Sequence, residues 1–206
     1  MIQYHKIYNV FKRNMDNPKR LLDGVWSDEA FDYLQNNEWV FTEKVDGTNI
    51  RVMVTDEITF GGKTDNAQIP TPLVKRLQER FLPQKDKLIE MFPDGGCLYG
   101  EGYGGKIQRG SKYRLEQDFV LFDVKVGEWW LKREDIVDIS EKLEIDVVPV
   151  VLTGTLNEGI RFTSTGLKST WGDFEAEGVI GHPTLELKNR HGGRIITKIK
   201  TCDFKD

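Results

Sequence analysis

The apolar residues of this chain recur mostly with the two-residue period of β-strands. In the segment 49–55, Ile50, Val52 and Val54 occupy every second position, which predicts a strand with one buried face. Further β-rich runs are predicted at 39–42, 98–101, 119–126, 145–151, 179–180, 185–187 and 195–199. A chain dominated by such runs is expected to fold around sheets.

Helical patterns are fewer. The residues Ser27-Asp28-Glu29 predict a capped short helix that continues to Leu34. A second helix is predicted over 70–92 with a break at Pro83, and a third over 134–143, where apolar residues have helical spacing. Because strands outnumber helices and do not alternate with them one for one, we expect an α+β fold of mainly antiparallel sheets with flanking helices.

The length of 206 residues leaves room for one well-buried core, so a single domain spanning 1–206 is expected. No segment approaches the ~20 apolar residues of a membrane span, so no membrane partner is expected. Residues 1–6 lack the apolar run of a secretory signal, which predicts a cytoplasmic location. Cys97 and Cys202 fit neither a disulfide framework nor a metal motif, and both are expected to be free thiols.

The net charge of -4 argues against a nucleic-acid partner, because phosphate binding usually relies on a basic surface. Two basic stretches without acidic residues contrast with this total. The first, 102–115, contains Lys106, Arg109, Lys112 and Arg114, and the second, 187–202, contains Lys188, Arg190, Arg194, Lys198 and Lys200. Each predicts either a phosphate-binding face or an ordinary solvated surface, and charge alone does not choose between them.

The segment 43–49 reads Glu-Lys-Val-Asp-Gly-Thr-Asn and lies between two predicted strands. Gly47 permits a tight turn, so Lys44 is expected at the end of a strand with its amine at the mouth of a sheet. A lysine amine acts as a nucleophile only when it is deprotonated, which burial or neighbouring cations favour. The alternative is a plain β-hairpin with an Asp-Gly turn, and the segment by itself favours that alternative.

Other short elements accompany Lys44-Val45-Asp46-Gly47 (KxDG). In chain order they are Gly100-Glu101 with its glycine-rich basic continuation, Phe122-Asp123, Glu177-Gly178 and the segment 198–200, and the amino-terminal segment 4–9 reads YHKIYN. Together they resemble the motifs of the covalent nucleotidyltransferase superfamily of ATP-dependent ligases and capping enzymes. The RNA ligase 2 family of nick-sealing RNA ligases is the most similar group, and the likeness runs from residue 4 to residue 200.

The resemblance implies the nucleotidyltransferase (adenylyltransferase) domain of the ATP-grasp-like ligase fold. It also implies an ATP-dependent RNA ligase, in which Lys44 takes AMP from ATP, the AMP passes to a 5′-phosphate end, and a 3′-hydroxyl attacks that end. ATP, with AMP covalently on Lys44, and Mg²⁺ or Mn²⁺ are then the cofactors. The implied partner is RNA, as free ends or as a nicked duplex.

The resemblance also assigns the nucleotide contacts. Phe122 is implied to stack on adenine, Glu43 to contact the base, Glu101 the ribose, and Asn49 to belong to the same nucleotide site. In the element after KxDG the family usually has arginine, whereas this chain has Lys63. Lys63 is carried over as a nucleotide contact, although a lysine lacks the bidentate grip of arginine on phosphate.

Carboxylates and lysines carry the implied chemistry. Asp46, Asp123 and Glu177 would organise the metal, because carboxylates and water are the ligands that Mg²⁺ prefers. The expected catalytic residues are Lys44, Asp46, Glu177, Lys198 and Lys200, the last two also contacting the α-phosphate. Five residues after Glu177 the family tends to have a basic residue, and here it is His182. His182 is either a phosphate contact when protonated or a plain turn residue before Pro183.

Two other readings share some of these motifs. A DNA ligase or an mRNA-capping guanylyltransferase normally carries a carboxy-terminal OB-fold, and RNA ligases of this kind a helical domain. Only residues 201–206 follow the last motif, so neither appendage is expected. The remaining alternative is a catalytically inactive nucleotide- or RNA-binding module. A binding-only site has no need for the nucleophile, so the intact Lys44 argues against it.

Overall fold

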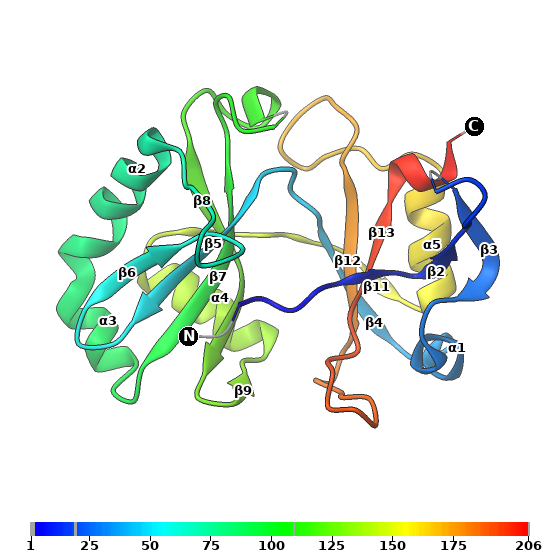
Figure 1. Cartoon of the computed structure of the whole chain (residues 1–206), viewed down its shortest axis with the longest axis horizontal. Coiled ribbons are helices and arrows are strands. Elements are labelled where there is room, and N and C mark those ends of the chain that lie inside the picture. Colours follow the sequence, from blue (N-terminus) through cyan, green and yellow to red (C-terminus); the bar gives the residue numbers. More distant parts are fainter. Residues whose placement is uncertain (1–2, 19, 109, 206) are drawn as a thin grey trace. The chain divides into compact units, whose positions relative to one another are not determined.

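The computed structural model describes residues 3–18, 20–108 and 110–205 (Figure 1). Its internal contacts divide the chain into two compact units. The first unit consists of the residues up to His5 together with Asp46–Val148, and the second of Lys6–Val45 together with the residues from Pro149 onwards. The expectation of a single domain over 1–206 stays a prediction.

A mainly antiparallel sheet forms the centre of the first unit. Its strands within the described residues are β5 (Thr48–Val54), β6 (Ile58–Gly61), β7 (Gly96–Tyr103), β8 (Asp118–Val126), β9 (Trp129–Trp130) and β10 (Asp146–Val147). They follow the order β10-β8-β7-β5-β6, with β9 paired to β8. The pair β10–β8 is parallel and the other pairs are antiparallel. Long neighbouring strands of this kind hold their side chains in fixed register.

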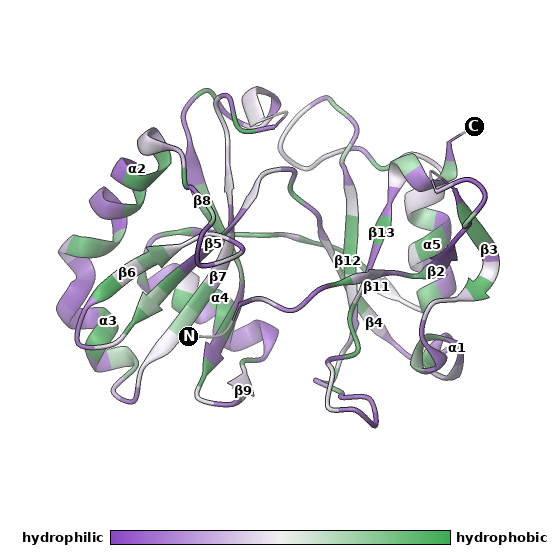
Figure 2. Ribbon diagram, in the orientation of Figure 1, coloured by the Kyte–Doolittle hydropathy of each residue, from purple (hydrophilic) through white to green (hydrophobic). Residues whose placement is uncertain are grey.

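The helices of the first unit pack their apolar sides on this sheet. They are α2 (Thr71–Phe81), α3 (Lys85–Met91) and α4 (Arg133–Lys142), with short 3-10 turns at Leu82–Gln84 and Gly110–Lys112. Leu73, Leu77 and Phe81 recur at helical spacing on α2 and are fully buried in the same core as Ile50 and Val52 of β5. The alternation of green and purple along α2 in Figure 2 displays this two-sided character.

A second mainly antiparallel sheet forms the centre of the second unit, with order β1-β13-β12-β4-β11. Its strands are β1 (Tyr8–Asn9), β4 (Trp39–Glu43), β11 (Val150–Gly154), β12 (Gly178–Pro183) and β13 (Thr197–Lys200), and β2 (Phe11–Arg13) and β3 (Leu21–Trp26) form a separate ribbon. Only β1–β13 is parallel among these described pairs. The core of this unit includes Trp39, Phe41 and Val179.

Two α-helices and one 3-10 turn complete the described part of the second unit. They are α1 (Glu29–Leu34), α5 (Leu156–Ser164) and the turn Thr201–Phe204. Asp28 caps α1, because its side chain accepts a hydrogen bond from the backbone of Ala30. In α5, Thr155 and Glu158 form a reciprocal capping box. The sequence prediction missed α5, although the pattern Thr155-x-x-Glu158 before apolar residues would have located its start.

The ring of Phe41 on β4 packs against two glycines so closely that no side chain would fit at either glycine position. A β-carbon built on Gly159 of α5 would lie 2.2 Å from the ring of Phe41, and one on Gly181 of β12 would lie 2.6 Å from it. Both distances are far below van der Waals contact. The ring of Phe41 therefore occupies the space that side chains at positions 159 and 181 would need.

Most predicted elements are confirmed, and the α+β fold with mainly antiparallel sheets is correct. The predicted strand at 185–187 is wrong, because Leu185 is exposed and the segment forms no ladder. The predicted run 145–151 is two short strands, β10 and β11, separated at Pro149, which has no N–H for a ladder. The run at 195–199 is shifted to Thr197–Lys200.

No helix among the described residues is long and apolar enough to cross a membrane. Both cysteines are free thiols, as predicted, with Cys97 buried and Cys202 exposed. Burial raises the pKa of Cys97 to about 11, so this thiol stays protonated at neutral pH.

Candidate active site

Lys44, Glu177 and Lys200 come together in the second unit. The Nζ atom of Lys44 lies 2.5 Å from Oε2 of Glu177, and the Nζ atom of Lys200 lies 2.6 Å from Oε1 of the same carboxylate. All three side chains are partly buried. One carboxylate thus holds two ammonium groups, which the sequence motifs had placed more than a hundred residues apart.

The strand register explains this meeting. Lys44 directly follows β4, Glu177 directly precedes β12, and Lys200 ends β13. The three strands are neighbours in the sheet, and the backbone N–H of Lys44 donates to the carbonyl of Gly178 at 2.9 Å. Gly178 has a φ of +150°, and a β-carbon on it would lie 2.0 Å from the carbonyl oxygen of Ile199. Only glycine fits at that position, which accounts for the Glu-Gly pair.

The charges of this cluster shift two titrations. Burial favours the neutral form of Glu177, but Lys44 and Lys200 outweigh it and lower the pKa of the carboxyl below its ordinary value of 4.5. Burial disfavours the charged form of Lys200, yet the hydrogen bond to Glu177 prevails and raises the pKa of that amine. Glu177 and Lys200 are therefore both charged at neutral pH.

Glu43, predicted to contact the base, is 1% exposed in the second unit. Its Oε1 accepts a hydrogen bond from Ser169 Oγ at 2.6 Å, and its Oε2 accepts two from Thr170, from the backbone N and from Oγ1, each at 2.8 Å. The side chain fastens the segment before β12 to the strand that leads into Lys44. These partners could not be predicted from the sequence, because Ser169 and Thr170 belong to no motif.

Lys198, predicted to contact the α-phosphate, lies two residues before Lys200 on β13. It is paired in register with Ile180 of β12 and with Asn9 of β1. Residues i and i+2 of a strand share a face, so Lys198 and Lys200 point to the same side of the sheet. The two lysines that the resemblance assigns to the α-phosphate thus lie on one face of β13.

In the first unit, Asp46 and Gly47 lie just before β5. The backbone N–H of Asp46 donates to the hydroxyl of Tyr113 at 3.0 Å. A β-carbon on Gly47 would lie 2.2 Å from the carbonyl oxygen of Gly102, so the chain passes β7 at a distance that only glycine allows. The alternative of a plain two-residue hairpin is wrong, because β4 and β5 belong to different sheets.

Asn49 and Glu101 are directly opposite each other on β5 and β7 of the first unit. The Oδ1 atom of Asn49 is buried and has no hydrogen-bond partner among the described residues. A buried acceptor of this kind is costly unless a donor reaches it. This atom is therefore suited to a ligand that supplies an N–H or O–H group.

Phe122 and Asp123 lie next to Tyr4, also in the first unit. The hydroxyl of Tyr4 donates to Oδ2 of Asp123 at 2.8 Å, and the ring of Tyr4 meets the ring of Phe122 edge-on with 5.1 Å between centroids. Tyr99 and Trp130 extend this aromatic cluster, each within 5.4 Å of the Tyr4 ring centroid. The sequence motifs include Tyr4 and Phe122, whereas Tyr99 and Trp130 belong to none of them.

Lys63 is exposed on the segment after β6. Arg51, which is almost fully buried, fixes this segment by donating to the carbonyl of Gly62 and to the carboxylate of Asp65, each at 2.8 Å. His182 lies within strand β12, where its Nδ1 is 2.8 Å from the carbonyl oxygen of Pro183. The interpretation of His182 as a turn residue is therefore wrong.

The two basic stretches differ in what their charges contact. Arg114 of the first stretch is tied to Asp118, a fully buried carboxylate that also receives Arg76 and Arg80, whereas Arg109 lies outside the described residues. In the second stretch, Arg194 pairs with Glu186 and Lys200 with Glu177. The described cations exposed in the two stretches are Lys106, Lys112, Lys188 and Arg190.

Among the residues that the structure describes, no three His, Cys, Asp or Glu side chains form a cluster that could hold a metal ion. Asp123 already accepts hydrogen bonds from Tyr4 and from the backbone of Val124. Carboxylate oxygens suit Mg²⁺ and Mn²⁺, and Mg²⁺ is commonly held by only one or two carboxylates together with substrate phosphates. The donor chemistry therefore fits a metal that arrives with a nucleotide.

A family model described as RNA ligase matches residues 37–200. Solved structures of Naegleria gruberi RNA ligase have a similar fold: a ligand-free mutant at TM-score 0.67 and 17% identity, a mutant with ATP and Mn at 0.67 and 17%, and the ligase with PPi at 0.66 and 18%. Each match covers 84% of this chain and 52% of the other, so the chain spans about half the length of those proteins. No curated protein sequence matches significantly. Because the family model covers most of its length, the chain belongs to the RNA ligase family.

Proposed function

We propose that this chain is an ATP-dependent RNA ligase that forms a lysyl-AMP intermediate on Lys44 and joins 5′-phosphate to 3′-hydroxyl ends of RNA. The observation that carries the proposal is the placement of Lys44 and Lys200 on the two oxygens of Glu177 in a chain of the RNA ligase family. The spacing of the motifs supports the nick-sealing RNA ligase 2 group in particular. Within this proposal the protein acts in the cytoplasm, where ATP is supplied.

Lys44 acts as the nucleophile. Its unprotonated Nζ attacks the α-phosphorus of ATP, an N–P bond forms, and the bond to pyrophosphate breaks as pyrophosphate leaves. A 5′-phosphate oxygen of RNA then attacks the same phosphorus and releases the lysine. Finally, a 3′-hydroxyl attacks the activated 5′-phosphate and releases AMP. Each step needs positioning and charge neutralisation more than further covalent help.

Lys200 and Lys198 supply the positive charge that stabilises the α-phosphate during transfer. Before the nucleotide binds, Glu177 contacts both Lys200 and Lys44 and offsets part of their positive charge. The Nζ atom of Lys44 is engaged in this contact, so Lys44 has to leave Glu177 before it can attack. In this proposal the nucleotide phosphates replace Glu177 as the partner of Lys200. Lys200 then no longer holds the carboxylate of Glu177 in place, which loosens the contact between Glu177 and Lys44.

Residues of the first unit carry the proposed adenosine contacts. Phe122 offers an aromatic face for the base, Glu101 a carboxylate for ribose hydroxyls, and Asn49 a buried acceptor for a donor of the nucleotide. Lys63 is proposed to contact phosphate. The carboxylate of Glu43 already accepts three hydrogen bonds from Ser169 and Thr170. Its proposed contact with the base is therefore indirect, through the segment that contains these two residues.

Asp46, Asp123 and Glu177 are the proposed ligands of Mg²⁺ or Mn²⁺ and its waters. The metal, when bound, neutralises phosphate charge during transfer. The residues themselves contribute hard oxygen donors, and the nucleotide phosphates complete the set. RNA ends, including those of a nicked RNA duplex, are the proposed polynucleotide partner.

Incubation of the protein with radiolabelled ATP or GTP and Mg²⁺, followed by a denaturing gel, tests this function. Covalent label from ATP alone is the expected result. Label from GTP would select a capping guanylyltransferase, and no label from either would select an inactive binding module. A DNA ligase would also take label from ATP, so sealing of nicked RNA must exceed sealing of nicked DNA.

A further inference from the structure

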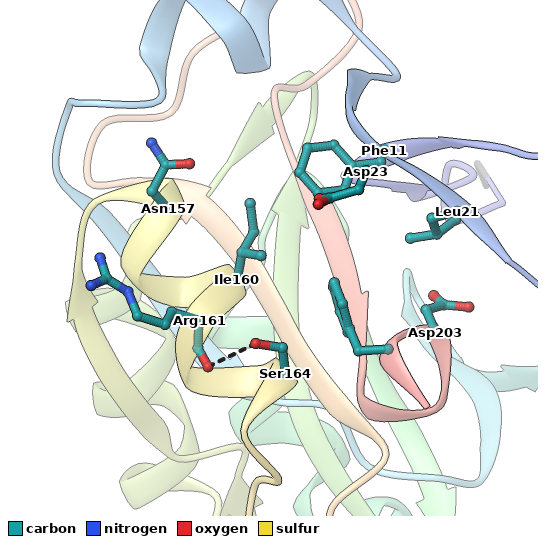
Figure 3. Close-up of a pocket in the computed structure, with 9 residues that line it drawn as sticks. Phe11, Leu21, Asp23, Asn157, Ile160, Arg161, Ser164 and Asp203 are labelled. Atoms are coloured by element: carbon teal, nitrogen blue, oxygen red, sulfur yellow. Dashed lines mark hydrogen bonds between the residues drawn. The ribbon is translucent and has the colours of Figure 1, made fainter. Parts of the chain in front are cut away.

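A cavity of about 400 Å³ opens within the second unit, and Lys44, Glu177 and Lys200 are not among its lining residues. It lies between the β2–β3 ribbon, one side of α5 and the 3-10 turn Thr201–Phe204 (Figure 3). The lining residues from α5 are Asn157, Ile160, Arg161 and Ser164, spaced as one face of a helix. This volume lies in the range of sites for small organic ligands.

The most unusual group in the wall is the carboxylate of Asp203. Its side chain is 4% exposed, and its Oδ2 atom is buried without a hydrogen-bond partner among the described residues. The neighbouring cation, Arg13, approaches only Oδ1, at 3.6 Å, which is too long for a good hydrogen bond. A buried carboxylate oxygen without a donor is costly, so a ligand that brings an N–H group to it would be stabilised.

The other polar groups of the wall also favour a ligand that donates. Asp23 of β3 contributes a second carboxylate, and it forms no ion pair within the part of the chain that is described. The hydroxyl of Ser164 donates to the carbonyl of Arg161, which leaves the hydroxyl oxygen as an acceptor. Figure 3 shows the guanidinium of Arg161 directed away from the two carboxylates. The interior of the cavity is therefore rich in acceptors.

The rest of the wall is apolar. Phe11, Leu21, Ile160 and Phe204 contribute hydrocarbon surface to the same cavity. Methylene groups are stabilised when such surface covers them. Two carboxylates and hydrocarbon surface in one cavity suit a molecule with two positive ends and an aliphatic chain between them.

We propose that this cavity binds an aliphatic diamine in its doubly protonated form. One ammonium group donates to Oδ2 of Asp203, the other meets Asp23, and the methylene chain lies on Phe11, Leu21 and Ile160. Binding requires no nucleotide, RNA or metal. Asp203 also interacts electrostatically with Lys198 and Lys200, but binding is measured without nucleotide or RNA, so its test stands whether or not the ligase activity is found.

Calorimetric titration of the full chain with diaminobutane, butylamine and butanol tests the proposal. Diaminobutane is expected to bind saturably at one site, butylamine about tenfold or more weakly because it can satisfy only one carboxylate, and butanol not measurably. Equal binding of butanol and butylamine would overturn the proposal, since the ammonium would then contribute nothing. If an N-acetyl-lysine amide bound more tightly than diaminobutane, the site would suit a lysine side chain, and the choice of a free diamine would be overturned.

Variants separate this site from general attraction to an acidic protein. Asp203→Asn and Asp23→Asn should each weaken diaminobutane binding about tenfold or more, whereas Asp16→Asn, which removes an exposed charge outside the cavity, should leave it unchanged. Equal weakening by all three variants would overturn the proposal. Thermal melting checks that each variant folds. If Asp203→Asn is unstable, Asp23→Asn still tests the proposal, because Asp23 is exposed and its substitution leaves the core intact.

Discussion

The Nζ atom of Lys44 lies 2.5 Å from Oε2 of Glu177. At this separation the two groups form a charge-assisted hydrogen bond. The Nζ atom that the proposal makes the nucleophile is therefore engaged by Glu177, and this contact has to open before Nζ can reach a substrate.

Lys44→Ala is expected to abolish covalent labelling by ATP and the sealing of 5′-phosphate ends, because the proposal gives no other amine this role. The same variant should still seal an RNA end that already carries AMP, since that step no longer needs the amine. Gel assays of both reactions make the measurement, with Lys75→Ala, on an exposed lysine of α2, as the matched control. Labelled Lys44→Ala protein would show that the nucleophile has been misassigned.

Glu177→Ala and Lys200→Ala are each expected to lower the rate of AMP transfer by orders of magnitude, about 10²-fold or more, because each removes a charge next to the reacting group. Single-turnover labelling provides the rates, and circular dichroism melts confirm that the variants are folded. Glu134→Ala, on an exposed glutamate of α4, is the control. Near-wild-type transfer in Glu177→Ala would remove Glu177 from the active site.

The lowered pKa of Glu177 predicts how the stability of the second unit depends on pH. A carboxyl whose pKa is lower in the folded state stabilises that state above the unfolded value, here 4.5, and loses this effect as pH falls through the folded value. Wild type should exceed Glu177→Gln by about 1–3 kcal/mol at pH 7, as expected for hydrogen bonds to charged groups. Chemical unfolding from pH 7 down to pH 3 should show this difference shrinking only below pH 4.5. A difference that grows in acid would contradict the direction of the shift.

Asp118→Asn is expected to destabilise the first unit by about 3–5 kcal/mol, because it removes a buried negative charge that three partly exposed arginines share. Asp118 is fully buried, and it accepts from Arg76, from Arg80 at 2.6 Å and from Arg114 at 2.5 Å. Denaturant unfolding measures the loss. Asp138→Asn breaks only an exposed pair with Lys142 and should cost less than about 1 kcal/mol. Similar losses in both variants would mean that the buried cluster contributes little.

Sealing and self-adenylylation are expected to respond differently to salt. The described basic stretches leave few cations exposed, Lys188 and Arg190 among them, so RNA binding by this chain should rest on a small number of phosphate contacts. Such binding weakens steeply as salt rises, whereas transfer of AMP to Lys44 does not depend on it. The two rates are compared across a potassium chloride series. Tight nick binding that ignores salt would point to a different docking surface.

Local signals allowed much of the fold to be predicted. Pro83 marks the break between α2 and α3, and Asp28 caps α1, because both effects depend on the residue itself and its nearest neighbours. The run at 185–187 has the composition of a strand, but Leu185 is exposed and has no neighbouring strand to pair with. Pairing is a long-range property that a local pattern does not contain.

The same distinction applies to the candidate site. The motifs identified Lys44, Glu177 and Lys200, and the structure brings these three together. The sequence did not reveal that Glu43 would be enclosed by Ser169 and Thr170, because those hydrogen bonds join residues 126 and 127 positions apart. Nor did it reveal the buried acceptor of Asn49, whose isolation depends on every residue packed around it.

The close packing of Phe41 against Gly159 and Gly181 has a consequence for mutational tolerance. Phe41 stands three residues before Lys44 on the strand that carries the lysine forward. Even a single methyl group at position 159 or 181 would push on that ring, and the strand would have to shift. In a saturation library screened for covalent labelling, these two positions are therefore expected to accept glycine alone. The location of the proposed nucleophile is determined in part by side chains that are absent.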